Sequence, residues 1–145
     1  MNQNFTHPIT LEQVFFVRSI VVAVPEHQPA PAGPHLQEGP SNHINVTPIE
    51  GQPGRFTVSM RTIINSEMKK ESPYFIDMEC MAVLTADDTL PPDEALRGVT
   101  ITGHSVVYGA IREAVLWLTG RQPYGPLSLG LSVLRPQESA ETTSP

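Results

Sequence analysis

A chain of 145 residues is long enough to bury the core of one domain. Its net charge of −6 argues against a nucleic-acid-binding protein, because phosphate recognition needs a basic face. Fifteen prolines and ten glycines predict long irregular connections between the secondary-structure elements.

The beginning of the sequence has no basic stretch followed by an apolar core, so we expect no signal peptide. No apolar run approaches the roughly 20 residues that span a bilayer. We therefore expect a soluble, cytoplasmic protein without membrane insertion. Residues 1–12 are expected to form a flexible tail, 13–134 a single domain, and 135–145 a disordered tail.

Four strands are predicted from β-branched and aromatic residues and from alternating polarity. The first, 13–24, has apolar residues at both parities, which indicates two apolar faces, and a Pro/Gly-rich loop over 25–41 follows it. Residues 43–50 and 55–66 are expected to pair as a hairpin, and 73–86 to form the fourth strand. In that strand one face is apolar and the other carries Asp77 and Glu79; the apolar face consists of Ile76, Met78, Cys80, Ala82 and Leu84.

One long helix is predicted after a crossover segment, 87–98, that contains at most a short helical turn. The helix is expected to begin near Thr102 or Gly103 and to end at Gly120, which suits a left-handed residue after a helix. Its apolar side chains fill an arc of roughly 180°, whereas one sheet covers only about 100°. The fold class is therefore α+β, a four-stranded antiparallel sheet with one long helix packed on one side, and the surplus apolar arc must meet a second surface.

No motif for catalysis, cofactor or metal binding is present: the sequence has no P-loop, G-x-G-x-x-G, H-E-x-x-H or paired-cysteine motif. The neighbours His104 and Ser105 do not face each other on a helix, so they form no nucleophile–base pair. The lone Cys80 lies in an apolar-alternating strand and is interpreted as a small buried hydrophobe. We expect no enzyme, no cofactor and no metal. A ligand-binding or enzymatic cleft near His104, Tyr108 and Glu113 remains an alternative.

Three stretches, in this order and spacing, resemble the SecB-type protein-export chaperones. They are "RSIVVAVPEHQP" (18–29), "SPYFIDMECMAVLTA" (72–86) and "YGAIREAVLWLTGRQPYGPLSLGLSVL" (108–134). The third contains an Arg-Glu pair at 112–113, a basic turn at 120–121, Tyr124 and a "PLSL" run. The resemblance covers about residues 14–134 and implies a chaperone that holds unfolded polypeptides in apolar surface grooves without ATP.

The resemblance also implies a homotetramer, a dimer of dimers in which first strands and helices make the interfaces. The surplus arc of the helix would supply the oligomer interface, which we expect at Val107, Ile111, Ala114 and Leu118. Apolar residues near the crossover and the helix would line the client groove, which we expect at Leu84, Leu90, Ile101, Tyr108, Trp117 and Tyr124.

The sequence departs from the family where export members contact the SecA translocation motor. The acidic positions of the first strand correspond to Ser19 and Ala23, and neither is acidic. Phe75 and Asp77 on the later strand do fit the motor contact, and we expect a partner contact there. We expect no counterpart of the family's second C-terminal helix, since the residues after Leu134 are rich in Pro, Ser and Thr. SecA binding is therefore expected to be weakened.

Three functions follow as alternatives. The first is a holdase for unfolded clients, with a role in export. The second is a SecB-like chaperone dedicated to one partner such as an antitoxin, which the missing acidic pair favours. The third is a non-enzymatic oligomerisation or ligand-binding module. Aggregation suppression, motor binding and the oligomeric state distinguish these alternatives.

Overall fold

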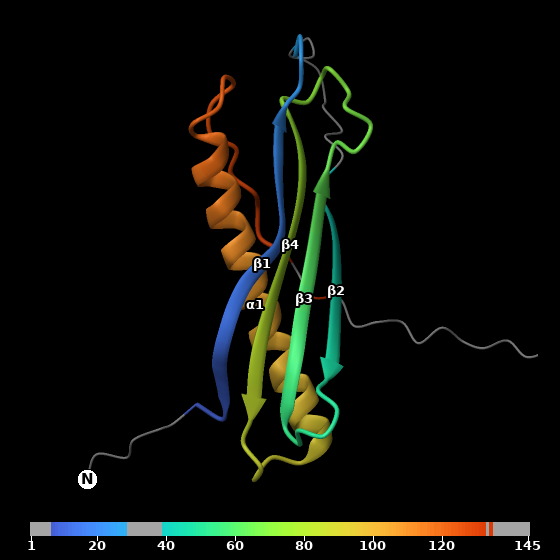
Figure 1. The fold of residues 1–145 in the computed structure, drawn as a ribbon, viewed down its shortest axis with the longest axis vertical. Helices are drawn as coiled ribbons and strands as arrows, with labels where there is room; N and C mark the ends of the chain where they lie inside the picture. Colours follow the sequence, from blue (N-terminus) through green and yellow to red (C-terminus); the bar gives the residue numbers. More distant parts are fainter. Residues whose placement is uncertain (1–6, 29–38, 133, 135–145) are drawn as a thin grey trace, which may run out of the picture.

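The computed structural model describes residues 7–28, 39–132 and 134, and this part of the chain holds four strands and one helix (Figure 1). In chain order they are β1 (Ile9–Ala23), β2 (Ser41–Pro48), β3 (Arg55–Ile64), β4 (Tyr74–Ala86) and α1 (Pro92–Thr119). The strands form one antiparallel sheet, and α1 lies across one of its faces. The predicted α+β architecture is confirmed.

The order of the strands in the sheet is β1-β4-β3-β2. β2, β3 and β4 follow one another as a meander, whereas β1 pairs with β4 rather than with β2. The connection after β1 therefore joins one edge of the sheet to the other. This leaves β1, a strand of 15 residues, with one unpaired edge.

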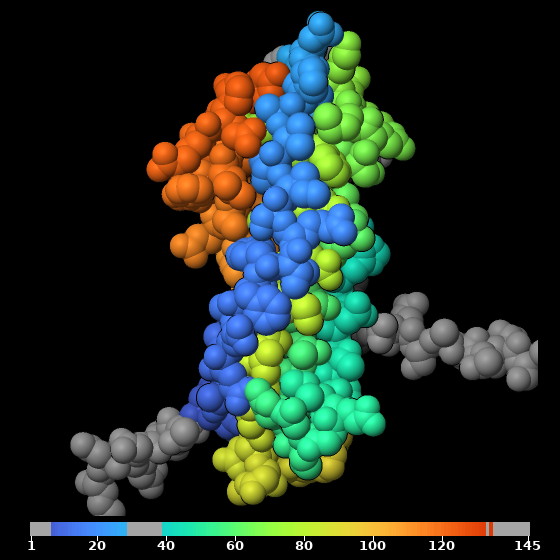
Figure 2. All heavy atoms as spheres, in the orientation of Figure 1, coloured from blue at the N-terminus to red at the C-terminus, as the bar shows by residue number. Residues whose placement is uncertain are grey.

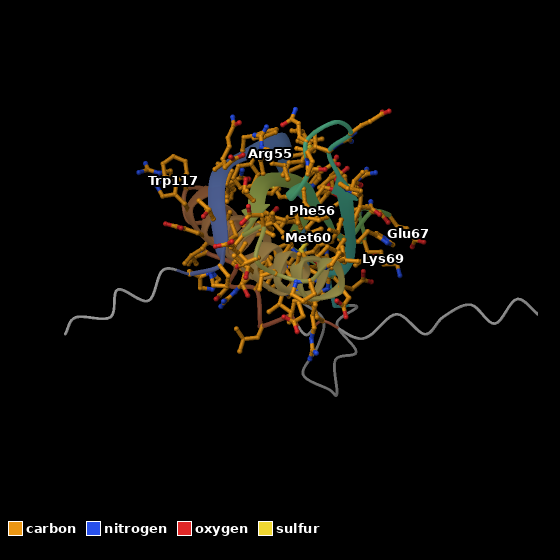
Figure 3. The ribbon with its side chains drawn as sticks, turned by 90° about the horizontal axis from the view of Figure 1, so that it is seen from below. Arg55, Phe56, Met60, Glu67, Lys69 and Trp117 are labelled. Atoms are coloured by element: carbon orange, nitrogen blue, oxygen red, sulfur yellow. The ribbon has the colours of Figure 1, made fainter. Side chains whose placement is uncertain are left out.

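β4 shows why the core lies on one side of the sheet. Its alternate residues from Tyr74 to Ala86 are buried toward α1, and the residues between them form the outer face. The predicted apolar face of this strand is confirmed, with every member from Ile76 to Leu84 at 0% exposure. Figure 3 shows Met60 of the neighbouring β3 between the sheet and the helix.

β1 begins at Ile9 rather than at residue 13, so residues 9–12 are part of the sheet. Its pairing with β4 shifts register between Leu11 and Gln13 and again between Phe16 and Arg18. Each extra residue exchanges the faces that odd and even positions occupy. The helix-facing side of β1 therefore carries even-numbered residues such as Phe16 before the second shift and odd-numbered residues such as Val21 after it. This change explains why apolar residues occur at both parities.

α1 begins at Pro92, and the predicted start near Thr102 or Gly103 is wrong. Proline is compatible with a first helical position, and Asp93 and Glu94 suit the positive end of the helix dipole. The glycines that interrupt the apolar pattern allow the helix to pack closely against the sheet. A Cβ at Gly103 would lie 2.5 Å from a Val58 methyl carbon.

The end of α1 at Thr119 agrees with the prediction, but the cap differs. Gly120 has φ −62° and ψ −17°, so the predicted left-handed conformation is wrong at this position. The left-handed glycine is Gly125, with φ +81°. The helix thus continues into a further turn, and the chain reverses direction at Gly125.

Two predicted segments cannot be compared directly with the structure. The predicted C-terminal tail, 135–145, lies outside the described residues, as does the greater part of the Pro/Gly-rich loop. Within the described residues, no helix combines the length and apolarity needed to cross a membrane.

Candidate functional site

The six residues expected to line a client groove lie in three different environments. Leu84 is fully buried on the inner face of β4, because alternation along the central strand points it at α1. It is therefore a core residue and cannot line a surface groove of this monomer. Leu90 packs against the same core, and Tyr108 is buried with its hydroxyl donating to the Gly130 carbonyl at 2.7 Å.

The other three predicted groove residues are exposed, but they do not form one groove. Ile101 is 51% exposed and lies on the same flank of α1 as Tyr108, seven residues on. Trp117 is 59% exposed and projects outward from the opposite flank (Figure 3). Tyr124 follows the helix and donates its hydroxyl to the Val24 carbonyl at 2.7 Å.

The predicted interface residues are divided in a similar way. Val107 and Ile111 are fully buried against the sheet of their own chain, so no surface of this monomer offers them to a partner. Ala114 and Leu118 instead border an open groove of about 520 Å³ between β1 and α1. This β1–α1 groove is lined by Phe16, Ala110, Glu113, Ala114, Trp117 and Leu118.

β1 extends the apolar surface well beyond the groove. Figure 2 shows the strand running along the molecule, with the C-terminal half of α1 beside its upper part. A long edge strand with exposed apolar side chains is a ready surface for another chain. The large hydrophobic side chains exposed on β1 are Leu11, Val14, Phe16, Val17 and Val22.

Arg121 places a positive charge at the rim of the groove. Its guanidinium carbon lies 4.6 Å from the centroid of the Trp117 ring, a cation–π distance. Glu113 is exposed beside the same ring, in the groove lining. The groove therefore has an apolar floor with charge of both signs at its border.

Asp77, a predicted partner contact, is bound by two arginines of its own chain. Its carboxylate accepts hydrogen bonds from Arg61 at 2.8 and 2.9 Å and from Arg18 at 3.2 Å. The Arg61 guanidinium holds the pKa of this carboxyl below its ordinary value, although burial opposes the shift. Phe75 lies on the same outer face, paired in register with Val22 of β1.

The positions that correspond to the motor contact on β1 face away from Asp77. Ser19 pairs with Met78 and Ala23 with Tyr74, so both lie on the helix side of the sheet. Phe75 and Asp77 lie on the outer side. The β1 bulge after Phe16 has this effect, because it exchanges the faces of the residues that follow.

The polar groups of the alternative cleft do not converge. His104 is buried, stacks on Tyr108 at a centroid distance of 6.0 Å and meets the Ser132 hydroxyl at 3.2 Å. Glu113 lies on the opposite flank of α1, in the β1–α1 groove.

Burial shifts the pKa of two side chains in the core. It lowers the pKa of His104, and it raises the pKa of the Cys80 thiol to about 11, which leaves the thiol protonated at neutral pH.

Metal binding finds no support in the described ranges, where no three His, Cys, Asp or Glu residues are grouped so that they could hold an ion. The histidines are instead used singly. His27, for example, bonds the Lys70 carbonyl at 2.6 Å and contacts the Tyr124 ring edge.

The segment after α1 was expected from the sequence to close the core, and the structure shows which helix residues hold it. Residues 126–132, here called the C-terminal strap, turn back after Gly125 and run beside the helix (Figure 1). Four helix side chains bond to it. The bonds join Thr119 Oγ1 to Leu127 N (2.8 Å), Arg112 Nε to Leu129 O (2.9 Å), Tyr108 Oη to Gly130 O (2.7 Å) and His104 Nε2 to Ser132 Oγ (3.2 Å).

These helix residues were visible in the sequence as polar positions spaced by four on one flank. His104, Tyr108 and Arg112 have this spacing, which places their side chains in a row. Their partners could not be inferred, because nothing in the spacing says that a later segment returns along the row.

No family model matches the sequence, and no curated protein matches it. Among solved structures, the fold matches the SecB-like chaperone Rv1957 of Mycobacterium tuberculosis, solved in complex with a ChAD peptide from the HigA1 antitoxin. The TM-score is 0.61 at 21% sequence identity, over 86% of this chain and 88% of that one.

The chain has a SecB-like fold.

A second solved structure, a protein of unknown function from Streptococcus agalactiae, matches with a TM-score of 0.57 at 10% identity. The match covers 85% of this chain and 97% of that chain. The SecB-like arrangement of sheet and helix therefore recurs where little of the sequence is shared. Both β1 and α1 of this fold expose apolar side chains in the present chain.

Proposed function

We propose that this protein is a molecular chaperone that binds unfolded or non-native polypeptides on apolar surfaces, without ATP and without catalysis. One observation carries the proposal: a SecB-like monomer leaves large hydrophobic side chains exposed along both β1 and α1. Clusters of exposed apolar side chains on a soluble protein often mark sites that bind a partner. The exposed members on the helix are Leu96, Ile101, Leu116 and Trp117.

The two flanks of α1 are assigned different partners. The β1–α1 groove adjoins an unpaired strand edge, and we place the contact between subunits of a homotetramer there. Ala114 and Leu118 remain in the proposed interface and are joined by Phe16 and Trp117. The flank that carries Ile101 is left for client polypeptides.

A chaperone dedicated to one partner is the second candidate. The Mycobacterium tuberculosis neighbour was solved with an antitoxin peptide, and that observation favours a partner of this kind. Ser19 and Ala23, which are not acidic, reduce the expected affinity for the SecA motor. Export is therefore the weaker of the two roles, and titration with the motor is expected to show weak binding.

The test of client binding is suppression of aggregation. A chemically unfolded test protein is diluted into buffer without nucleotide, and light scattering is followed with increasing amounts of this protein. Suppression at substoichiometric tetramer is expected. Ile101→Asp should raise the concentration needed by roughly five- to tenfold, since it removes about 1 kcal/mol of apolar contact or more.

Ser105→Asp is the matched control, because it adds the same charge to an exposed position of the same helix without removing an apolar side chain. It should leave the scattering curve unchanged. Unsuppressed aggregation at every ratio of wild-type protein to client would overturn the chaperone proposal. If the two substitutions had equal effects, only the role of Ile101 in client binding would be rejected, and the chaperone proposal would stand.

A further inference from the structure

Three of the four hydrogen bonds that hold the C-terminal strap involve its backbone and do not depend on its sequence, whereas the fourth joins His104 to the Ser132 side chain. Arg112 Nε donates to the Leu129 carbonyl, and the Tyr108 hydroxyl donates to the Gly130 carbonyl. A backbone carbonyl is present at every residue of any polypeptide. The two donors lie four residues apart on α1 and therefore point from the same flank. This flank presents a binding site for polypeptide backbone.

The geometry of the contact requires a stretched segment. The helix row from Thr119 to His104 is about 22 Å long. The strap residues bonded to its two ends are Leu127 and Ser132, which are at most about 18 Å apart when fully extended. The helix side chains reach across the difference. The flank therefore accommodates a chain that is close to full extension.

The apolar part of the contact has a matching period. Leu127 is partly buried and Leu129 is 6% exposed, and both pack with the core. Ser128 and Gly130 face outward between and after them. Alternation with period two is typical of an extended segment with one buried side. Leu131, the next position of this period, is 85% exposed, so the site takes two aliphatic side chains that lie two residues apart.

The row of helix residues continues beyond the end of the strap. Ile101 stands three positions before His104, on the same flank, and is exposed. An incoming polypeptide can bury this side chain before any bond to the strap is broken. The flank therefore combines an open apolar end with an occupied one.

We propose that the flank formed by His104, Tyr108, Arg112 and Thr119 is a subsite for extended aliphatic segments of client polypeptides, and that the strap occupies it as an internal competitor. The inference rests on the proposed chaperone function and names the place and chemistry of client binding. A client enters over Ile101 and displaces the strap. It takes over the carbonyl bonds to Arg112 and Tyr108, and its aliphatic side chains replace Leu129.

The exchange has a consequence for selectivity. The strap and the client form the same hydrogen bonds, from Arg112 and Tyr108 to backbone carbonyls, so these bonds do not favour either. The client must therefore match the apolar burial of Leu129 to displace the strap. The apparent affinity is the intrinsic affinity reduced by the fraction of molecules with a free flank. Polar extended segments then fail to bind, and segments with alternating aliphatic residues succeed.

The first experiment weakens the strap without altering the flank. A fluorescein-labelled peptide GPLSLGLS, the sequence of residues 125–132, is titrated with the full-length protein and fluorescence anisotropy is measured. Leu129→Ser should bind it about tenfold more tightly than the wild type, since the internal competitor is lost. Leu131→Ser makes the same exchange at a side chain that is 85% exposed, and should bind like the wild type.

A third variant tests the flank itself. Adding Arg112→Met to Leu129→Ser removes the donor to the carbonyl and should reverse most of the gain in affinity. Equal peptide affinity of Leu129→Ser and the wild type overturns the proposal. It is overturned as well if the gain persists undiminished in the double variant.

Leu129→Ser also removes a core contact, so a second measurement uses the wild-type chain. The Leu127 amide, bonded to Thr119 Oγ1, is followed by hydrogen exchange with and without a saturating, reduced and carboxymethylated unfolded protein. Exchange at Leu127 should accelerate when the client is bound, while the Met60 amide in the central sheet stays protected. Unchanged or slower exchange at Leu127 overturns the subsite.

The two proposals fail in different ways. Suppression of aggregation by a protein whose strap stays protected keeps the chaperone function and overturns only the subsite. Tight peptide binding by Leu129→Ser without any suppression of aggregation keeps the subsite and overturns the chaperone function.

Discussion

At the scale of single residues, Asp77 shows how position decides the role of a carboxylate. On the strand it alternates with buried apolar neighbours and therefore lies on the outer face, as the sequence predicted. Only the pairing of β1, β4 and β3 brings Arg18 and Arg61 to it from both sides. The side chain is 6% exposed, so its charge is satisfied by these arginines rather than by water.

Replacing Asp77 by Asn should lower the free energy of unfolding at pH 7 by about 1–3 kcal/mol, because hydrogen bonds to a charged group are lost. The pKa of Asp77 is lower in the folded state than in the unfolded state. Its stabilisation is therefore complete above the unfolded pKa near 3.8 and is lost as the pH falls through the folded pKa. Urea unfolding at pH 7 and at pH 3 measures both effects.

Glu79→Gln is the control for this substitution, since Glu79 lies two residues on, on the same outer face, and is more exposed. We expect it to change stability less than Asp77→Asn does. The same acid sensitivity in wild type and Asp77→Asn would show that Asp77 does not stabilise the fold through its charge.

At the scale of elements, α1 is the part that the sequence predicted least accurately. The prediction placed a crossover over residues 87–98 and began the helix near Thr102 or Gly103, so Gly98 was expected outside the helix and Gly103 at its start. In the structure both glycines are inside the helix, where they let it approach Ile9 and Val58 closely. Helix propensity counts against glycine, but the close packing requires it.

Gly103→Ala is expected to destabilise the protein by about 1–3 kcal/mol, because its methyl group would lie 2.5 to 2.9 Å from Val58 carbon atoms. Gly109→Ala on the same helix meets nothing within 4 Å and should stabilise by about 0.5–1 kcal/mol. Chemical denaturation followed by circular dichroism measures both changes. If Gly103→Ala stabilised the protein as much as Gly109→Ala does, a tight contact at Gly103 would be ruled out.

At the scale of the whole molecule, the apolar surface determines the proposed assembly. The sequence predicted a surplus apolar arc on the helix, and the structure places it in two parts. Val107 and Ile111 are buried against the sheet, while Trp117 projects beside β1. We therefore expect the tryptophan to stabilise the proposed oligomer rather than the monomer.

Trp117→Ala should shift the protein toward smaller assemblies, with a loss of association energy of about 2 kcal/mol or more per contact. The unfolding midpoint of the dissociated chain should change little, because the side chain is 59% exposed. Light scattering coupled to size-exclusion chromatography gives the mass. Leu116→Ala, an exposed apolar change outside the groove lining, should leave the mass unchanged. A wild-type monomer at high concentration would contradict the assembly.

The candidate site was only partly accessible from the sequence. Ile101, Trp117 and Tyr124 were predicted to line the client groove; they are exposed, but they do not lie in one groove. Leu84 was misplaced because a groove list drawn from apolar residues cannot separate a core side chain from a surface one. Alternation had already placed Leu84 on the apolar face of β4, and α1 covers that face, so the side chain is excluded from a surface groove.

The sequence by itself determined that four strands precede one long helix, the alternating faces of β4 and the absence of charge along the apolar helix face. These follow from periods of 2.0 and 3.6 residues, which are local properties of the backbone. Only the tertiary structure decided that β1 pairs with β4, that two arginines satisfy Asp77 and that the strap lies on the Tyr108–Arg112 flank. These contacts join residues far apart in the chain, and their energy exists only once the fold brings them together.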